Sequence, residues 1–116
     1  MLGWELPPHI NGGMGVVCYE MSKVLAEHGA TIDFVLPYVA AHPEAEKFMN
    51  IIGIEANSPR PGGGFGVYDD WAAQPRALHE VNDHYTSIAL TRARMHQPDV
   101  IHAHDLPMAN TAMKIA

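Results

Sequence analysis

Two short clusters of residues in this sequence could do chemistry, and the first is a glycine-rich turn. It reads Asn11-Gly12-Gly13-Met14-Gly15, and adjacent glycines let a ligand approach the backbone closely. If a helix starts here, its free N–H groups favour an anion such as phosphate. The turn has neither the Lys-Ser/Thr pair of a Walker loop nor the Gly-x-Gly-x-x-Gly spacing of dinucleotide-binding proteins. Two alternatives therefore stay open: a phosphate-type site or a tight turn with only a structural role.

The second cluster is His102-Ala103-His104-Asp105. Alternation along a strand places His102 and His104 on the same face, where two imidazoles could bind a metal ion, as in a metal-dependent hydrolase. However, no His, Cys, Asp or Glu follows Asp105, and the candidates elsewhere have no supporting spacing. The cluster favours a polar site for hydroxyl groups, since Asp accepts and His can donate or accept. A structural role, with Asp105 capping the next helix, is the remaining alternative.

The elements that would position the first cluster form a strand, a helix and a strand. Residues 1–5 are short and apolar, and Pro7-Pro8 stops the strand. The helix begins at about Gly15, ends at Gly29, and has an apolar face of Val17, Met21, Val24, Leu25 and His28. Residues 31–36 are rich in β-branched and apolar side chains, which predicts a strand closed by Pro37. This pattern predicts a right-handed βαβ unit with parallel strands.

The rest of the chain continues the alternation. The pattern predicts a short helix over residues 43–50, a third strand over 51–56 and a loop over 57–66. A long helix over residues 76–97 has an apolar face of Leu78, Val81, Tyr85, Ile88 and Ala89. A strand over residues 99–104 and a helix from Leu106 follow. The fold class is therefore α/β, an open parallel sheet with helices on both faces, whose ligands bind at the carboxyl ends of the strands.

Composition narrows the classes of function. The 116 residues suit one domain, and 7 basic against 13 acidic residues give a formal charge of −6. That balance argues against nucleic acid or an anionic membrane surface as a partner. No apolar run approaches the roughly 20 residues of a transmembrane segment, and the first residues do not resemble a signal peptide. With a single cysteine, Cys18, which the helical pattern predicts to be a core residue, we expect a cytoplasmic protein.

Together the two clusters resemble one family. The segment Trp4–Gly15 with the helix and strand after it resembles the opening of family 4 retaining glycosyltransferases, with the closest likeness to the bacterial glycogen- or starch-synthase-like branch. The segment Asp99–Asp105 is similar to the same family's Asp-Val-Val/Ile-His-Ala-His-Asp motif, in the same order and at similar spacing. The likeness covers residues 1–38 and about 76–116, whereas residues 39–75 match loosely. Ile10 and Asn11 stand where glycogen synthases often have a lysine, and Leu106 stands where the family usually has Trp.

The resemblance implies a fold and a division of labour. Residues 1–116 would be an incomplete N-terminal Rossmann-like domain of a GT-B glycosyltransferase. In the family this domain mainly holds the acceptor. The C-terminal domain, which binds the nucleotide-sugar, would be missing from this chain. By position, Gly12 and Gly13 would approach the donor pyrophosphate and sugar, and Asp105 with His104 would bind sugar hydroxyls. The donor would be a nucleotide-sugar such as UDP- or ADP-glucose and the acceptor a glycan, with no metal or other cofactor.

The same resemblance places the catalytic histidine beyond Ala116, so no catalytic residue is assigned and the chain alone is expected to be inactive. Two alternatives come from other classes. One is a non-catalytic α/β module that binds a phosphate or a nucleotide through the glycine turn. The other is a metal-dependent hydrolase that uses His102 and His104. The sequence leaves open the donor, the acceptor, the oligomeric state and the role of residues 39–75.

Overall fold

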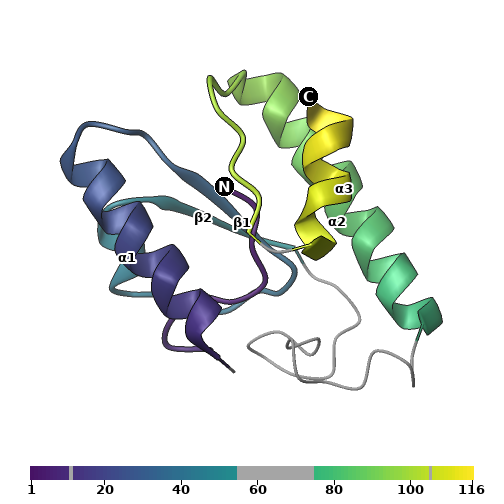
Figure 1. Cartoon of the computed structure of the whole chain (residues 1–116), viewed down its shortest axis with the longest axis horizontal. Coiled ribbons are helices and arrows are strands. Elements are labelled where there is room, and N and C mark those ends of the chain that lie inside the picture. Colours follow the sequence, from purple (N-terminus) through teal and green to yellow (C-terminus); the bar gives the residue numbers. More distant parts are fainter. Residues whose placement is uncertain (11, 55–74, 105) are drawn as a thin grey trace.

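The structure is a computed structural model that describes residues 1–10, 12–54, 75–104 and 106–116 (Figure 1). The loop predicted over residues 57–66, the end of the third predicted strand and Asp105 lie outside these residues. The described elements, in chain order, are α1 (Gly13–Glu27), β1 (Asp33–Leu36), the 3-10 helix η1 (Ala45–Lys47), β2 (Asn50–Gly53), α2 (Pro75–His96) and α3 (Leu106–Ile115).

The sheet is parallel and has the strand order of a Rossmann-like fold. β1 pairs with β2, with Phe34 opposite Ile51. Leu2 forms parallel bridges to Val35 of β1 and to Ala103. Across the sheet, β2 is followed by β1, then by the segment around Leu2 and finally by the segment around Ala103. When the strands are numbered along the chain, this order is 3-2-1-4, as in a Rossmann-like fold. The predicted fold class, an open parallel α/β sheet, is confirmed.

Several elements are shorter than the sequence predicts. The first and fourth strands, expected over residues 1–5 and 99–104, are reduced to isolated bridges at Leu2 and Ala103. Hydrogen bonds of 2.9 Å from Leu2 N–H to the His102 carbonyl and from His104 N–H to the Leu2 carbonyl support the bridge between them. The helix predicted over residues 43–50 is only η1. Asn50 N–H already donates to the Ile32 carbonyl at 2.9 Å, so pairing of β2 with β1 leaves no room for a longer helix.

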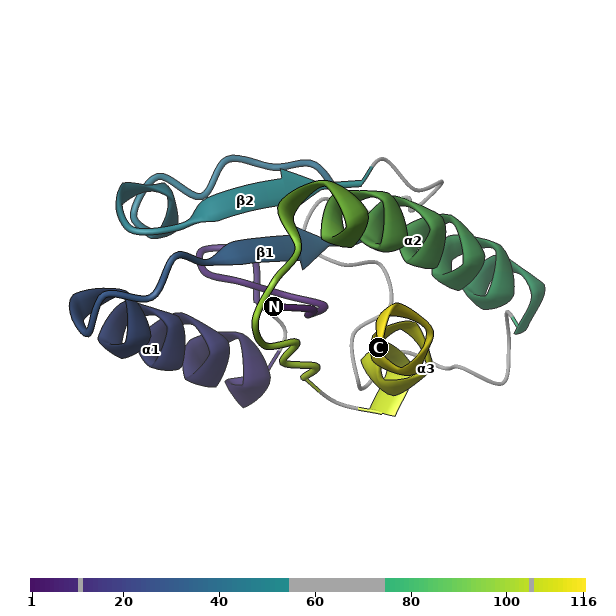
Figure 2. The ribbon, with the colours of Figure 1, turned by 90° about the horizontal axis from the view of Figure 1, so that it is seen from above.

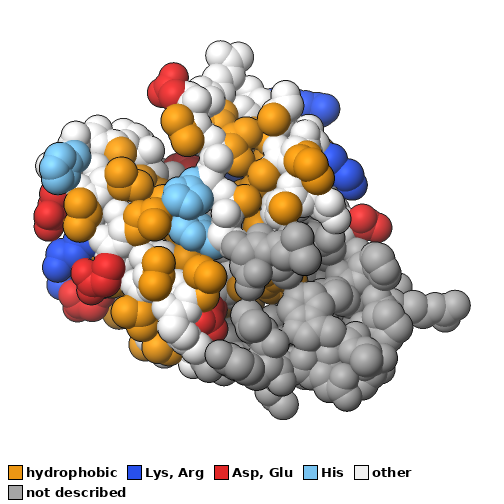
Figure 3. Space-filling view, viewed as in Figure 1, with side chains coloured by type: hydrophobic (Ala, Val, Ile, Leu, Met, Phe, Trp, Pro, Cys, Tyr) orange, Lys and Arg blue, Asp and Glu red, His pale blue; other side chains and the backbone are white. Residues whose placement is uncertain are grey.

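Helix α1 turns a different face to the sheet from the one that its apolar spacing predicts. The predicted face is largely solvent-exposed, with Val17 51% and Val24 49% accessible, and Figure 3 shows apolar side chains along this helix. The buried residues are instead the small ones, Gly15, Cys18 and Ser22. Small side chains let the helix approach the large side chains of β1, and Phe34 and Leu36 are completely buried in the same cluster as Cys18.

Helices α2 and α3 cover the opposite face of the sheet (Figure 1, Figure 2). Tyr85, Ala89 and Met108 form a second core cluster with Leu2, Trp4 and Val35. The Tyr85 hydroxyl donates to the Val35 carbonyl at 2.8 Å, and the hydroxyls of Thr86 and Thr111 are 2.7 Å apart between the two helices. For the described side chains, the predicted inner face of the long helix is confirmed. Within the described residues, no helix is both long and apolar enough to cross a membrane.

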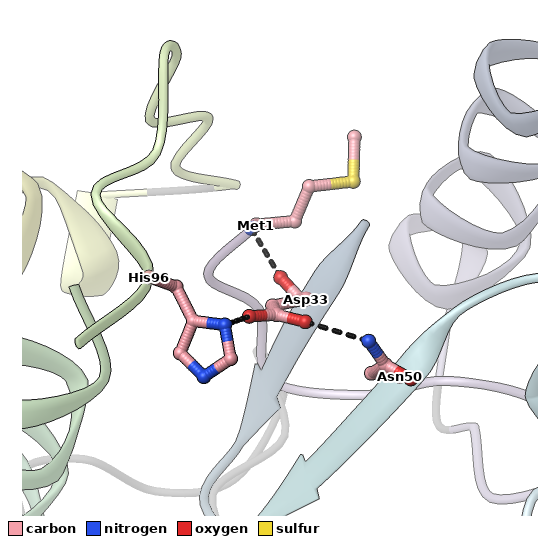
Figure 4. A network of polar contacts seen from close by, with 4 residues as sticks. All are labelled: Met1, Asp33, Asn50 and His96. Carbon is pink, nitrogen blue, oxygen red and sulfur yellow. Dashed lines mark hydrogen bonds and ion pairs between the residues drawn. The ribbon is translucent and has the colours of Figure 1, made fainter. Parts of the chain in front are cut away.

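A polar network joins the amino ends of the strands (Figure 4). Asn50 Nδ2 donates to Asp33 Oδ1 at 2.9 Å, and His96 Nδ1 lies 3.6 Å from Asp33 Oδ2. The amino group of Met1 donates to the Asp33 carbonyl at 2.6 Å. A pocket of about 60 Å³ lies beside this network, between β1 and the end of α2. These contacts fix the end of α2 against the sheet, at the edge opposite the glycine turn.

Candidate functional site

The two predicted clusters lie at one edge of the sheet, where the parallel strands have their carboxyl ends. Glu5 and Leu6 follow the segment around Leu2, Tyr38 follows β1, and His104 follows Ala103. Helices α1 and α3 both begin on this side, at the lower part of Figure 1. This is the edge at which ligands bind in open α/β folds.

The first two glycines of the turn lie at the start of α1. Gly12 precedes α1 in an extended conformation, with φ −160° and ψ −167°, and no side chain caps the helix from this position. Gly13 is exposed, and a Cβ atom added to it would meet no atom within 4 Å. The backbone at Gly13 therefore leaves room for the close approach of another group.

The third glycine has a different role, which the sequence analysis missed. The Gly15 N–H donates to Glu5 Oε1 at 3.0 Å, and Glu5 is buried with 7% of its surface exposed. A Cβ atom on Gly15 would lie 2.6 Å from Ile10 Cγ2 and 3.1 Å from Glu5 Cγ. Gly15 therefore makes room for internal packing, and Glu5 supplies the carboxylate that a helix N-terminus favours. In the sequence, this cap can be recognised from Glu5, an acidic residue at the end of the first predicted strand and shortly before the glycine turn.

His102 and His104 lie on the same side of their strand, as alternation predicts. Their rings stack with centroids 4.3 Å apart, and the His104 ring also stacks on Phe34 at 6.0 Å. Gly3 makes room for the Phe34 ring, since a Cβ atom there would lie 2.7 Å from Phe34 Cζ. Figure 3 shows histidine side chains in the middle of this face of the molecule.

The chemistry of His104 suits hydroxyl groups. Burial lowers the pKa of His104 to about 4, and the charges of His102 and the N-terminal amine act in the same direction. The ring is therefore neutral at pH 7, with one nitrogen that donates and one that accepts. Among the described residues, His104 Nε2 has no hydrogen-bond partner although it is buried. Asp105, its predicted neighbour in the site, lies outside the described residues.

The structure also brings together three rings that the sequence did not connect: Tyr38, His9 and His42. The centroid of His42 lies 5.3 Å from that of His9 and 5.7 Å from that of Tyr38. His42 Nδ1 donates to the Pro7 carbonyl at 2.9 Å, and the Tyr38 hydroxyl accepts the Leu6 N–H at 3.2 Å. Burial lowers the pKa of His42, which keeps this ring neutral. This ring cluster ties the loop before the glycine turn to the loop after β1.

Metal binding is the other chemistry that the sequence leaves open, whereas Cys18 is predicted to be a core residue. Within the part of the chain that the structure describes, no three His, Cys, Asp or Glu side chains come together as metal ligands. Cys18 is completely buried, and burial together with the charge of Glu5 raises its pKa to about 12. Its thiol is therefore protonated and unreactive at neutral pH, which agrees with the predicted core role.

Comparison with protein families decides between the classes of function. The model of Glycosyltransferase Family 4 matches residues 11–116. The chain belongs to this family. No curated protein and no solved structure matches it. The resemblance drawn from the sequence motifs is confirmed at the level of the family, and the matched range of this family 4 chain includes Gly12, Gly13, His104 and Asp105.

Fold and family agree for this family 4 chain. Its parallel sheet with helices on both faces is part of a Rossmann-like half of the GT-B architecture. A glycosyltransferase domain works in general on a sugar donor and an acceptor. The open backbone at Gly13 and the neutral ring of His104 are two described features of this edge that suit ligands with hydroxyl groups.

Proposed function

We propose that this family 4 chain is part of the N-terminal Rossmann-like domain of a retaining GT-B glycosyltransferase, an enzyme that moves a sugar from a nucleotide-sugar to a glycan acceptor. One observation carries the proposal: the glycine turn and His104 come from separate motifs of the family and lie at the same edge of the sheet. Ligands of open α/β sheets bind at this edge. In the proposal, the cleft for transfer lies between this edge and a second, donor-binding domain.

Each site residue has a proposed role. Gly12 and Gly13 contact the donor or its sugar through the backbone, because glycine has no side chain and the space beside Gly13 is open. His104 and Asp105 hydrogen-bond sugar hydroxyls, and the neutral state of His104 lets the ring both donate and accept. We assign no catalytic residue, metal or further cofactor to residues 1–116, and we expect no transfer by the chain alone.

The proposed branch of the family and the proposed substrates rest on the sequence motifs. The segment Trp4–Gly15 favours the glycogen- or starch-synthase-like branch, with UDP- or ADP-glucose as donor and an α-glucan as acceptor. A cytoplasmic location is part of this proposal, because the single buried Cys18 fits a reducing compartment. Turnover of either nucleotide-sugar by the chain alone would contradict the division of labour between two domains.

Calorimetric titration with maltotriose, UDP-glucose and ADP-glucose tests the proposal. The glucose units of maltotriose serve as a probe for the position of the donor sugar beside the turn. We expect saturable binding of maltotriose to the wild-type chain, and a loss of at least about tenfold in affinity for Gly12→Val, both for maltotriose and for the nucleotide-sugar that the chain binds. Gly12 has an extended backbone that valine also adopts, so the substitution adds a side chain at the turn with no change in backbone conformation.

Ala30→Val is the matched control, because Ala30 is exposed and follows α1 at its other end. The control should bind like the wild type. Equal affinities for Gly12→Val and the wild type would mean that the turn has only a structural role.

A further inference from the structure

The imidazole of His104 belongs to a stack of three rings on one face of the sheet. Its centroid lies 4.3 Å from that of His102, with the ring planes 18° apart, and 6.0 Å from that of Phe34, with the planes 15° apart. Phe34 is part of β1, whereas the two histidines lie two residues apart on the segment around Ala103. The His104 ring is therefore packed by rings from two different strands.

Gly3 allows the stack to extend across the sheet. It follows Leu2, which forms bridges to the strands on both sides, so it lies between the strand of Phe34 and the strand of His104. A Cβ atom on Gly3 would lie 2.7 Å from Phe34 Cζ. Because glycine leaves this space to the Phe34 ring, the ring extends over the central strand toward His104.

Packing has to fix the plane of the His104 ring, because rotation about the bond to an imidazole is soft. The terminal torsion of histidine has broad, two-fold minima instead of three sharp ones. Among the described residues, no group hydrogen-bonds to the buried Nε2 of His104. The nitrogens of an imidazole donate and accept in the plane of the ring, so this plane decides where a sugar hydroxyl can bind.

The two rings that contact His104 have different surroundings. Phe34 is completely buried in the core cluster that contains Cys18 and Leu36, so the interior of the fold fixes its position. His102 is only partly buried, and its ring is the nearer of the two to the ring of His104. A change at position 102 therefore alters the contact with His104 and leaves the core cluster intact.

We propose that His102 is a positioning residue, whose stacked ring holds the imidazole of His104 in the plane in which its nitrogens meet sugar hydroxyl groups. The inference rests on the proposed function, in which His104 binds these hydroxyls, and it adds a residue that acts through His104. Because His102 contributes a flat ring, another flat ring can replace it, whereas a small side chain cannot.

Two substitutions separate the ring of His102 from its nitrogens. His102→Ala removes the stacking partner, and His102→Phe keeps a flat ring. In calorimetric titrations we expect maltotriose to bind about tenfold more weakly to His102→Ala, and within about twofold of the wild-type affinity to His102→Phe. His84→Ala is the matched control, because His84 is exposed on α2, which covers the other face of the sheet, and it should bind like the wild type.

A measurement on the chain without ligand keeps the test independent of sugar binding. Nuclear Overhauser contacts between the ring protons of His104 and Phe34 report the plane of the His104 ring. We expect these contacts in the wild type and in His102→Phe, and their loss in His102→Ala.

Three results would overturn the inference: unchanged ring contacts in His102→Ala, wild-type affinity for maltotriose in the same variant, or a tenfold loss of affinity in His102→Phe. The last result decides by itself if His102→Ala does not fold, because it would mean that the nitrogens of His102 are needed. A wild-type chain that binds no maltotriose, with ring contacts that change as expected, would contradict the proposed function and leave the positioning of His104 standing.

Discussion

At the scale of single residues, the glycines of this chain have different functions. Gly3 and Gly15 are required by neighbours, because Phe34 and Ile10 occupy the space where a Cβ atom would lie. Gly13 has no such neighbour and leaves the backbone open to solvent. The same residue type therefore makes room for internal packing at two positions and leaves the backbone open at another.

Gly3→Ala and Gly13→Ala separate these functions. The added methyl group at Gly3 would lie 2.7 Å from Phe34 Cζ, and we expect a loss of about 1–3 kcal/mol in the free energy of unfolding. Gly13→Ala should leave stability unchanged or raise it by up to about 1 kcal/mol, because alanine favours a helix. Urea unfolding of both variants measures the difference, and equal losses would contradict this division.

His104 makes stability depend on pH. Its pKa is lowered from the ordinary 6.5 to about 4 in the folded chain, so between these values the unfolded chain binds more protons. The stability that the neutral ring of His104 gives the folded chain is complete above pH 6.5. As the pH falls toward 4, the free energy of unfolding decreases by roughly 1–3 kcal/mol. His42, whose pKa is also lowered, acts in the same direction.

His104→Phe isolates this contribution, because phenylalanine keeps a ring against Phe34 and cannot be protonated. Urea unfolding at several pH values between 4 and 7 should give a shallower dependence on pH for the variant than for the wild type. Identical slopes for the two proteins would show that His104 is not held neutral by burial.

At the scale of elements, α1 shows where apolar spacing is misleading. Valines and a leucine recur at helical spacing along its outer surface, yet the residues that face the sheet are Gly15, Cys18 and Ser22. The cap from Glu5 to Gly15 holds this face inward, and small side chains allow close packing against β1. Periodicity predicts which residues share a face, but it cannot tell which face a capped helix turns to its neighbour.

Val17→Ser and Cys18→Leu test the orientation of α1. Val17 is 51% exposed, so its substitution should change the free energy of unfolding by no more than about 0.5 kcal/mol. Cys18 is completely buried, and the larger leucine should cost about 1–3 kcal/mol. Denaturant unfolding of the two variants gives the comparison, and the reverse order of stability would favour the face that apolar spacing predicts.

At the scale of the whole molecule, the strand order brings distant motifs together. The segment around Leu2 lies between β1 and Ala103, so residues from both ends of the chain meet at one carboxyl edge. The sequence motifs predict a site at this edge, because the family resemblance, the alternation of residues 99–104 and the glycine turn all indicate the carboxyl ends of the strands. They could not predict the ring cluster of Tyr38, His9 and His42, because its members come from two loops whose contact depends on the folded backbone.

The location of a bound sugar tests the central claim most directly. Backbone amide resonances of the chain, recorded during titration with maltotriose, show which residues the ligand contacts. We predict saturable shifts at Gly12, Gly13 and His104, with little change at Asp33 and His96 near the amino ends of the strands. Saturable shifts confined to Asp33 and His96, or no saturable shift at any residue, would contradict a sugar site at the carboxyl edge.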